Sequence, residues 1–284
     1  MNDTGKNTEK KYFNIAEVLK NSDSKKLRRL PWFIVKLIEK IICQDQMNRV
    51  INKYIDNIGV SFQPQVIKEF NLTLNVRGVE NLPDKSCCFF AANHPFGMID
   101  GLILTYYVGQ KYGDLKAIGN AAFLHVPNLR PLIAAVNLYG QSSKEYITAL
   151  EEVYNSDVAI THFPAGEVSR VYNGKVQDAP WQKSFITKAI SAKRDIVPFY
   201  FEGTNSRFFY FIYRLRKIMG IKMKFELLLL SREMFKKKNK PIRLVIGKPI
   251  PWQHFDNSMT HYEWAQKVRE HVYKMEQSKE ELTF

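Results

Sequence analysis

A histidine and an aspartate six positions apart are the first pattern in this sequence that could do chemistry. An apolar run beginning at Cys87 ends at His94, and Asp100 follows a turn that contains Pro and Gly. A histidine that accepts a proton needs a partner that fixes its tautomer and stabilises the imidazolium, and an aspartate on the next turn can be that partner. The pair is therefore a candidate general base. The same spacing also fits a simpler arrangement, in which Asp100 caps a helix and His94 is a turn residue.

A second polar cluster follows an apolar run that ends near Phe163. The run breaks on Pro and Gly, and Glu167, Ser169 and Arg170 then lie close together in a predicted loop. The planar guanidinium of arginine pairs with phosphate or carboxylate, and a glutamate can orient it or bind a hydroxyl group. The cluster suits a polar, anionic head group, although taken alone it is more typical of a surface loop with a local ion pair.

Three further residues close to these patterns need an interpretation. Cys88 lies shortly before His94, which raises a covalent Cys–His mechanism, but its place inside an apolar run favours buried packing. His162 is interpreted as structural, and because the histidines show no metal-ligand spacing we expect no metal site. Pro198 interrupts the apolar run from Ile196 to Phe201 and predicts an edge or an end of a strand.

The elements that must position these residues are predicted from the apolar patterns. Short runs typical of strands alternate with helical patterns along most of the chain. The predicted strands are Leu72–Val76, Cys87–Ala92, Leu115–Ile118, Ala134–Tyr139, Val158–Phe163, Ile196–Phe201 and Ile242–Ile246, and the predicted helices between them are Gly101–Gln110, Ser142–Tyr154 and Trp181–Lys193. Such alternation predicts a layered α/β fold with a central mixed, largely parallel sheet flanked by helices. Ligands bind at the carboxyl ends of strands in open sheets of this kind, which is where His94 is expected.

Both ends of the chain have helical patterns. Apolar positions from Met47 to Ile58 extend a helical segment that begins near Pro31, and an amphipathic helix is predicted from Trp264 to Met275. With 45% hydrophobic residues the chain can bury a large core, which excludes a globally disordered protein. The simplest division is an N-terminal amphipathic helical extension over residues 1–65 and one catalytic domain over 66–284.

Taken together, the patterns resemble the glycerolipid acyltransferase superfamily. Its members carry an Asn-His block followed by Asp, then a Phe-Pro-x-Gly block and a Val-Pro block, in the order found here over roughly residues 70–250. The sequence around His94 and Arg170 is most similar to a bacterial branch of this superfamily that carries a hemolysin label. That branch includes O-acyltransferases that complete ornithine and glycine aminolipids. The resemblance implies that His94 and Asp100 are catalytic and that the substrate-binding residues are Asn93, Pro95, Gly97, Phe163, Pro164, Gly166, Glu167, Ser169, Arg170 and Pro198.

The reaction implied by this resemblance is acyl transfer from a thioester to a hydroxyl group. His94, held by Asp100, takes the proton of the acceptor hydroxyl group, whose oxygen attacks the thioester directly. The acyl donor is then a thioester of acyl carrier protein or of coenzyme A, and no cofactor is expected. Backbone amides near Gly97 or Gly166 are candidates for stabilising the oxyanion.

Two departures from the phosphatidic-acid-forming pattern bear on the acceptor. Five residues, where that pattern has four, lie between His94 and Asp100, and Ala165 stands after Phe-Pro where that pattern has Glu, with the acid shifted to Glu167. We therefore expect a lyso-aminolipid acceptor, an ornithine or glycine lipid, with lysophosphatidic acid as the alternative. An alternative of another class is a non-catalytic, hemolysin-like membrane-binding protein.

The net charge of +14 is concentrated in two segments, residues 25–40 with +5 and residues 207–240 with +9. Both segments are rich in large apolar residues, which favours interfacial membrane helices over a nucleic-acid-binding arm, so we expect no nucleic-acid partner. An amphipathic core helix with a solvated basic face is an equally good interpretation of residues 25–40. The same charges could recruit acyl carrier protein, which is acidic.

We expect a peripheral protein on the cytoplasmic side of a membrane. The best candidate for a spanning segment, Cys87–Val108, is interrupted by His94 and Asp100 and lacks the 18 or more uninterrupted apolar residues that a spanning helix needs. Residues Met1–Lys11 lack the apolar run of a secretory signal. The three cysteines form no disulfide framework or zinc pattern.

Overall fold

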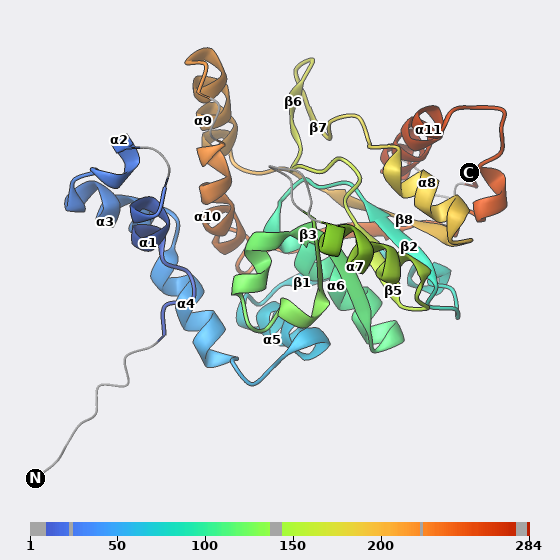
Figure 1. The fold of residues 1–284 in the computed structure, drawn as a ribbon, viewed down its shortest axis with the longest axis horizontal. Coiled ribbons are helices and arrows are strands. Elements are labelled where there is room, and N and C mark those ends of the chain that lie inside the picture. The colour runs from blue at the N-terminus through green and yellow to red at the C-terminus, as the bar shows by residue number, and fades with distance from the viewer. Residues whose placement is uncertain (1–9, 23–24, 137–143, 222–223, 277–282) are drawn as a thin grey trace, which may run out of the picture.

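A central seven-stranded sheet organises the part of the chain that the structure describes (Figure 1). The structure is a computed structural model that describes residues 10–22, 25–136, 144–221, 224–276 and 283–284. The sheet consists of β1 (Thr73–Arg77), β2 (Cys88–Ala92), β3 (Leu115–Asn120), β4 (Ile133–Val136), β5 (Ala159–His162), β8 (Asp195–Glu202) and β9 (Pro241–Ile246). In the order β1-β9-β8-β2-β5-β3-β4, neighbours are parallel except for the antiparallel pair β8 and β9. The predicted mixed, largely parallel sheet is confirmed.

Strand β2 lies at the middle of this sheet, between β8 and β5, and all five of its residues are buried. Phe90 packs into the core on one face of the sheet and Phe89 into the core on the other. Because both faces are covered, the strand is a continuous apolar run without alternation, which is typical of buried parallel strands. This burial fixes the strand end from which His94 follows.

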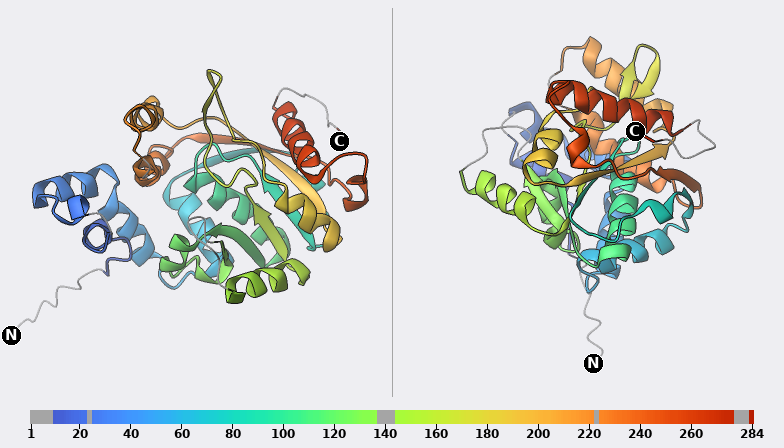
Figure 2. Two further views of the ribbon diagram at one scale, coloured as in Figure 1. Left: turned by 45° about the horizontal axis from the view of Figure 1, so that its top comes forward. Right: turned by 90° about the vertical axis from the view of Figure 1, so that its right-hand side faces the viewer.

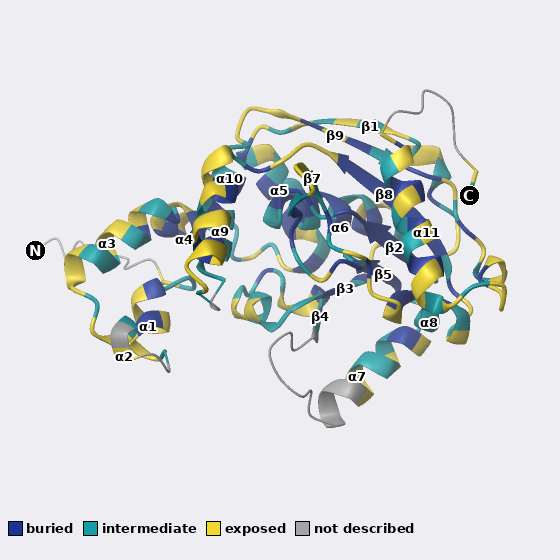
Figure 3. Cartoon of the chain, turned by 90° about the horizontal axis from the view of Figure 1, so that it is seen from above, coloured by how far each residue is buried: buried dark blue, intermediate teal, exposed yellow. Residues whose placement is uncertain are grey.

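Helices cover both faces of the sheet (Figures 2 and 3). Helices α5 (Phe62–Glu69) and α6 (Met98–Tyr112) pack on one face, and α7 (Lys144–Asn155), α8 (Ser184–Ser191) and α11 (His261–Lys274) pack on the other. All three helices predicted between the strands are present, as is the predicted closing helix. Residues 137–139 of the predicted fourth strand and residues 142–143 of the predicted second helix lie outside the described residues.

The N-terminal region is helical, as predicted, but it is divided into several short helices. Within the described residues these are α1 (Ile15–Lys20), α2 (Lys25–Arg28), α3 (Trp32–Ile41) and α4 (Gln44–Lys53). Cys43 has φ of 57°, in the left-handed region, and this turn separates α3 from α4. The boundary expected between residues 65 and 66 falls inside α5, whose Phe62 and Val66 belong to the main core.

Two features follow the central strands, a hairpin that no sequence pattern indicated and a pair of helices in the basic segment 207–240, where helices were expected. A hairpin of β6 (Arg170–Tyr172) and β7 (Lys175–Gln177) follows β5, and α9 (Arg207–Ile218) and α10 (Leu230–Phe235) follow β8. Ile41 of α3 packs with Phe209 of α9, and the Ser231 hydroxyl donates to the Ile42 carbonyl, so the N-terminal helices lie beside α9 and α10 (Figure 1). Short 3-10 helices are at Gly59–Ser61, Val79–Asn81, Ala121–His125, Arg130–Leu132, Phe225–Leu229 and Trp252–His254.

The length and the apolar character of a helix decide whether it can cross a bilayer. Over the described ranges, none combines the length and the apolar character needed to cross one.

Candidate active site

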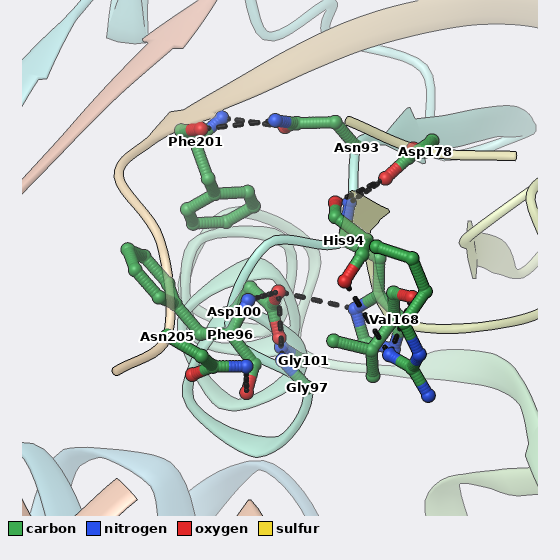
Figure 4. Close-up of polar contacts among 12 residues, drawn as sticks. Asn93, His94, Phe96, Gly97, Asp100, Gly101, Val168, Asp178, Phe201 and Asn205 are labelled. Carbon is green, nitrogen blue, oxygen red and sulfur yellow. Dashed lines mark hydrogen bonds and ion pairs between the residues drawn. The ribbon is translucent and has the colours of Figure 1, made fainter. Parts of the chain in front are cut away.

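The carboxyl end of β2 brings His94 and Asp100 together (Figure 4). The chain turns after His94, and α6 begins at Met98, so Asp100 is the third residue of that helix. His94 Nδ1 lies 3.1 Å from Asp100 Oδ2, an ion-pair distance without the alignment of a regular hydrogen bond. The His94 side chain is 16% exposed, whereas the Asp100 side chain is fully buried. The imidazole therefore meets solvent on one side and a buried carboxylate on the other.

Backbone amides hold the Asp100 carboxylate in place (Figure 4). Oδ2 accepts hydrogen bonds from Phe96 N at 2.8 Å and Gly97 N at 3.1 Å, and Oδ1 accepts one from Gly101 N at 2.9 Å. Burial disfavours the charged carboxylate, but His94 and the Phe96 and Gly97 amides outweigh it and hold the pKa of Asp100 below its ordinary value. Asp100 thus caps α6 and also presents an ionised partner to His94.

The second sequence pattern packs directly against the first. Strand β5 pairs with β2 in parallel, with Ala91 opposite His162, so that Phe163 emerges beside His94. The His94 and Phe163 rings stack with centroids 3.9 Å apart and planes 21° apart. Ser169 N donates to the His94 carbonyl at 2.8 Å. The strand ends therefore assemble both predicted patterns around one imidazole.

Asn93 ties two strands together at the site. Its side-chain Nδ2 donates to Phe201 O at 2.9 Å, and Phe201 N donates to its Oδ1 at 2.7 Å (Figure 4). Both polar atoms of this buried amide are thus used to join the end of β2 to β8. Asn93, which was expected to bind substrate, thus holds the end of the strand that carries His94.

The amides expected to stabilise an oxyanion are engaged inside the protein. Gly97 N donates to Asp100, and Gly166 N donates to Phe163 O at 2.9 Å. Pro95 and Pro164, the prolines of the two turns, are buried. The two turns therefore use their amides to hold their own shape.

Arg170 lies in a buried charge cluster, which differs from the expected contact with a head group. It is 1% exposed, and its Nη2 lies 3.4 Å from Glu226 Oε1. The other oxygen of Glu226 lies 2.7 Å from Arg216 Nε. The Arg170 guanidinium also lies 5.1 Å from the centre of the Phe209 ring. These contacts join the β6–β7 hairpin to α9 and enclose Arg170.

Glu167 is the part-exposed acid of the second pattern. Its Oε2 lies 2.9 Å from Lys224 Nζ, and the Tyr172 hydroxyl donates to its Oε1 at 3.4 Å. Burial opposes the charge of Glu167, but the ammonium of Lys224 and the nearby Arg170 hold its pKa below the ordinary value. The loop after Phe163 therefore presents charges of both signs.

Pro198 lies in the middle of β8, and β8 lies between β2 and β9, so the predicted edge or end of a strand was wrong. Its neighbours Val197 and Phe199 pack on the α6 face of the sheet, so Pro198 points to the opposite face. Proline has no N–H to donate to a neighbouring strand, but its carbonyl accepts a hydrogen bond from Gly247 N at 2.8 Å. Pro198 thus faces away from the side on which α6 presents Asp100.

Cys88 and His162 occupy apolar surroundings. Cys88 is fully buried on β2, and burial raises the pKa of its thiol to about 12, so it holds no thiolate at neutral pH. His162 Nδ1 is buried without a hydrogen-bond partner among the described residues, and burial lowers its pKa to about 4. Within the same ranges no three His, Cys, Asp or Glu side chains gather as metal ligands. The expectation of no metal remains a prediction.

Asp178, which the sequence patterns missed, also lies at the site. It is buried, and its Oδ1 accepts a hydrogen bond from His94 N at 3.1 Å. The residue is a lone acid between a short hairpin and α8, and no periodic pattern includes it.

A cavity of about 600 Å³ lies away from this site, along β1, β9 and β8. Arg77, Glu202 and Arg243 are among the residues that line it.

Comparison with known proteins shows which class of protein this fold and site define. The chain matches the acyltransferase family over residues 17–281 and belongs to it. Two curated relatives, from Bacteroides thetaiotaomicron and Phocaeicola vulgatus, are each named lyso-glycine lipid O-acyltransferase. Each is 38% identical over 263 residues, which cover 92% of this chain and 97% and 94% of the respective relative. These matches confirm the predicted enzyme class and the resemblance to the aminolipid branch.

Among solved structures, the chain is similar to the 1-acyl-sn-glycerophosphate acyltransferase PlsC of Thermotoga maritima. The sequence identity is 17% and the TM-score is 0.47, over 78% of this chain and 83% of that one.

Proposed function

We propose that this acyltransferase moves a fatty acyl group from an acyl thioester to the hydroxyl group of a lyso-aminolipid, with His94 as general base and Asp100 as its partner. The observation that carries this proposal is the 3.1 Å contact between the partly exposed imidazole and the buried carboxylate. The names of the two relatives support a lyso-glycine lipid as acceptor. A lyso-ornithine lipid is the closest chemical alternative.

The proton follows a short path in this mechanism. Because Nδ1 faces Asp100, the other ring nitrogen, Nε2, accepts the proton of the acceptor hydroxyl group. The hydroxyl oxygen attacks the thioester carbonyl, and the C–S bond breaks as the tetrahedral intermediate collapses. The departing thiolate takes the proton from the imidazolium. The ionised Asp100 stabilises the imidazolium between these two steps.

General-base assistance contributes about 10²- to 10⁴-fold in rate, so the remaining acceleration comes from positioning and oxyanion stabilisation. The stacked Phe163 ring and the fixed His94 backbone supply positioning. Since the Gly97 and Gly166 amides are engaged, we propose that the oxyanion donor is another group.

The part-exposed pair of Glu167 and Lys224 is the proposed contact for the acceptor head group. Both charges lie on or against the loop that follows Phe163, whose ring stacks on His94. An aminolipid head group carries a carboxylate and, in ornithine lipids, an ammonium group, which match the two signs of charge. Ser169, Arg170 and Asn93 then shape the site through contacts inside the protein.

Two helices are the proposed membrane-docking surface. On α3, Trp32 is 75% exposed, and Phe33 and Leu37 are also exposed. On α9, exposed Phe211 and Ile218 stand seven positions apart on one helical face, and Ile218 is 83% exposed. Interfacial helices combine such apolar faces with basic residues. Helices α3 and α9 lie in the two segments, residues 25–40 and 207–240, that hold the net positive charge.

The position of α10 connects this surface to the site. A Cβ at Gly97 would lie 2.9 Å from the Leu230 side chain, and Lys237 Nζ lies 4.1 Å from the centre of the Phe96 ring. Helix α10 therefore lies against the turn between His94 and Asp100. We propose that a lipid acceptor reaches His94 from a bilayer that is in contact with α9. We propose docking at the cytoplasmic leaflet, since its negative surface potential attracts basic segments.

The donor is proposed to be an acyl thioester of acyl carrier protein or of coenzyme A. Both carry negative charge, which suits the positive field of the two basic segments. The two donors are distinguished by assaying both.

A product assay tests the proposed function. Purified protein with anionic vesicles is given a labelled acyl thioester, on acyl carrier protein or coenzyme A, and lyso-glycine lipid, lyso-ornithine lipid or lysophosphatidic acid. We expect an acylated aminolipid, with a loss of about 10²- to 10⁴-fold in His94→Ala. The control is vesicle binding by His94→Ala, which should equal that of the wild type.

Three outcomes would contradict the proposal in different ways. If only lysophosphatidic acid is acylated, the acceptor is lysophosphatidic acid and not a lyso-aminolipid. Full activity of His94→Ala would exclude His94 as the base. Vesicle binding without acylation of any acceptor by either donor would favour the non-catalytic alternative.

A further inference from the structure

Asp178 is a buried carboxylate at the centre of a hydrogen-bond network behind His94. Its Oδ1 accepts hydrogen bonds from His94 N at 3.1 Å and from Ser169 Oγ at 2.5 Å. Its Oδ2 accepts one from Trp181 Nε1 at 2.9 Å. Asp178 N donates to the Tyr273 hydroxyl at 2.8 Å. One side chain therefore joins the end of β2, the loop after β5 and the segment that leads into α8.

The backbone of His94 is held on both sides by this network. Its N–H donates to Asp178, and its carbonyl accepts from Ser169 N at 2.8 Å. Ser169 in turn donates its hydroxyl to Asp178, so the three residues close a ring of hydrogen bonds. The peptide that carries the imidazole is therefore fixed independently of the contact between the ring and Asp100.

Burial of the charged Asp178 carboxylate costs folding free energy. It is 1% exposed, and burial raises the pKa of its carboxyl above the ordinary value, although the Ser169 and Trp181 donors oppose this. Buried carboxylates with perturbed pKa values cluster at functional sites. Charged groups that face Asp178 come from two elements, His94 after β2 and Arg269 of α11, whose Nη2 donates to the Asp178 carbonyl.

We infer that Asp178 is a positioning residue for acyl transfer, which holds the His94 backbone and the Ser169 loop at the distance from Asp100 that the proposed base requires. This inference rests on the proposed function. A displacement of about 1 Å at a reacting group can cost about 100-fold in rate, so the network acts on the rate of the chemical step more than on substrate binding.

The test compares Asp178→Ala with Asp178→Asn. The alanine variant leaves His94 N without its acceptor, whereas an asparagine oxygen can still accept from it. We expect Asp178→Ala to lower kcat about 100-fold, with the KM of donor and acceptor nearly unchanged. Asp178→Asn keeps an acceptor for His94 N but turns its amide Nδ2, a donor, toward Trp181 Nε1, so it should recover part of that loss.

Asp195→Ala is the matched control, because it also removes an aspartate that accepts a hydrogen bond from a main-chain amide, that of Trp252, but at the amino end of β8. It should keep the wild-type kcat. Thermal unfolding of each variant reports the structural contribution separately. Asp178→Glu, which keeps the acceptors but moves them by one methylene, replaces Asp178→Ala if the latter does not fold, and it should also lose kcat at unchanged KM.

Several results would overturn the inference. Wild-type kcat in folded Asp178→Ala or Asp178→Glu would do so, as would an equal loss of kcat in Asp195→Ala. A failure of the proposed function is distinguishable, because the wild-type protein itself would then acylate no lyso-lipid.

Discussion

Asp100 shows at the scale of one residue that two interpretations of a sequence pattern can hold together. Its carboxylate caps α6 through backbone amides, and it also lies 3.1 Å from the His94 ring. The cap holds the carboxylate so that it has one orientation toward the ring. Burial opposes the charge, but His94 and these amides keep the pKa of Asp100 below its ordinary value, so the carboxylate can pair with an imidazolium.

Replacing Asp100 with asparagine tests this division of roles. Asp100→Asn removes the charge that stabilises the His94 imidazolium, so we expect kcat to fall by about 10²- to 10⁴-fold. Steady-state kinetics of acyl transfer measures it. Cys88→Ala is the control, because the Cys88 thiol is buried and protonated, and its kcat should equal that of the wild type. A large loss in Cys88→Ala would revive a covalent mechanism.

His162 predicts a pH dependence of stability. Burial lowers its pKa to about 4, whereas an unfolded chain binds this proton near pH 6.5. Between these values the unfolded state binds more protons, so the free energy of unfolding falls as pH drops from about 6.5 to 4, by roughly 3 kcal/mol in total. Denaturant unfolding at several pH values measures this. His162→Gln should flatten the curve in that window, and parallel curves would exclude His162 as the cause.

At the scale of elements, helix α6 carries the site through its first turn. A glycine stands at each end of the helix, Gly97 with φ of 93° and Gly113 with φ of 75°. The two ends differ in their surroundings. A Cβ at Gly97 would lie 2.9 Å from Leu230 and 3.1 Å from Val168, whereas a Cβ at Gly113 would meet nothing within 4 Å. Only the N-terminal end combines backbone strain with close packing.

The two glycines form a matched pair of substitutions. Gly113→Ala should lose about 1–2 kcal/mol of stability, because alanine is strained at this φ value, and Gly97→Ala should lose more, because its Cβ also meets Leu230 and Val168. Gly97→Ala should also lower kcat on the order of 100-fold, since it displaces the turn whose amides hold Asp100. Thermal unfolding and kinetics separate the two effects. Equal activity of the two variants would show that the turn is not critical.

At the scale of the whole molecule, the positive charge and the exposed apolar residues coincide. Helices α3 and α9 belong to the two basic segments and carry exposed apolar side chains, and Ile41 at the end of α3 packs with the cluster around Phe209 of α9, although the two helices begin 175 residues apart in the chain. Helix α10 then joins this surface to the turn at Gly97. This surface is the one proposed to dock on a membrane, and α10 connects it to the turn that precedes Asp100.

Vesicle binding tests this arrangement. Replacing Phe211 and Ile218 with serine removes two exposed apolar side chains from α9, so binding to anionic vesicles should weaken at least about tenfold, given roughly 1.5–3 kcal/mol for each fully buried side chain. Tyr262→Ser, at an exposed residue of α11, is the control and should bind as the wild type does. Raising the salt concentration should weaken binding further. Equal binding of both variants would place the docking surface elsewhere.

The sequence by itself determined the strand order along the chain and the two patterns at the strand ends. Strands β2 and β8 can be predicted from the sequence because burial on both faces requires a continuous apolar run. The pairing of His94 with Asp100 can be predicted because a strand end, a Pro/Gly turn and a helix start are local signals in the sequence. The mixed sheet then follows from the alternation of elements.

Only the tertiary structure decided which partners the polar residues have. Arg170 meets Glu226, 56 positions away, and His94 meets Asp178, 84 positions away. Pro198 lies inside the sheet, although its residue type is typical of an edge. Periodicity and turn chemistry are encoded over a few neighbouring residues, whereas these contacts depend on how distant elements pack. A single chain carries no local signal for such contacts, so the network around Asp178 became visible only once the strands and loops were in place.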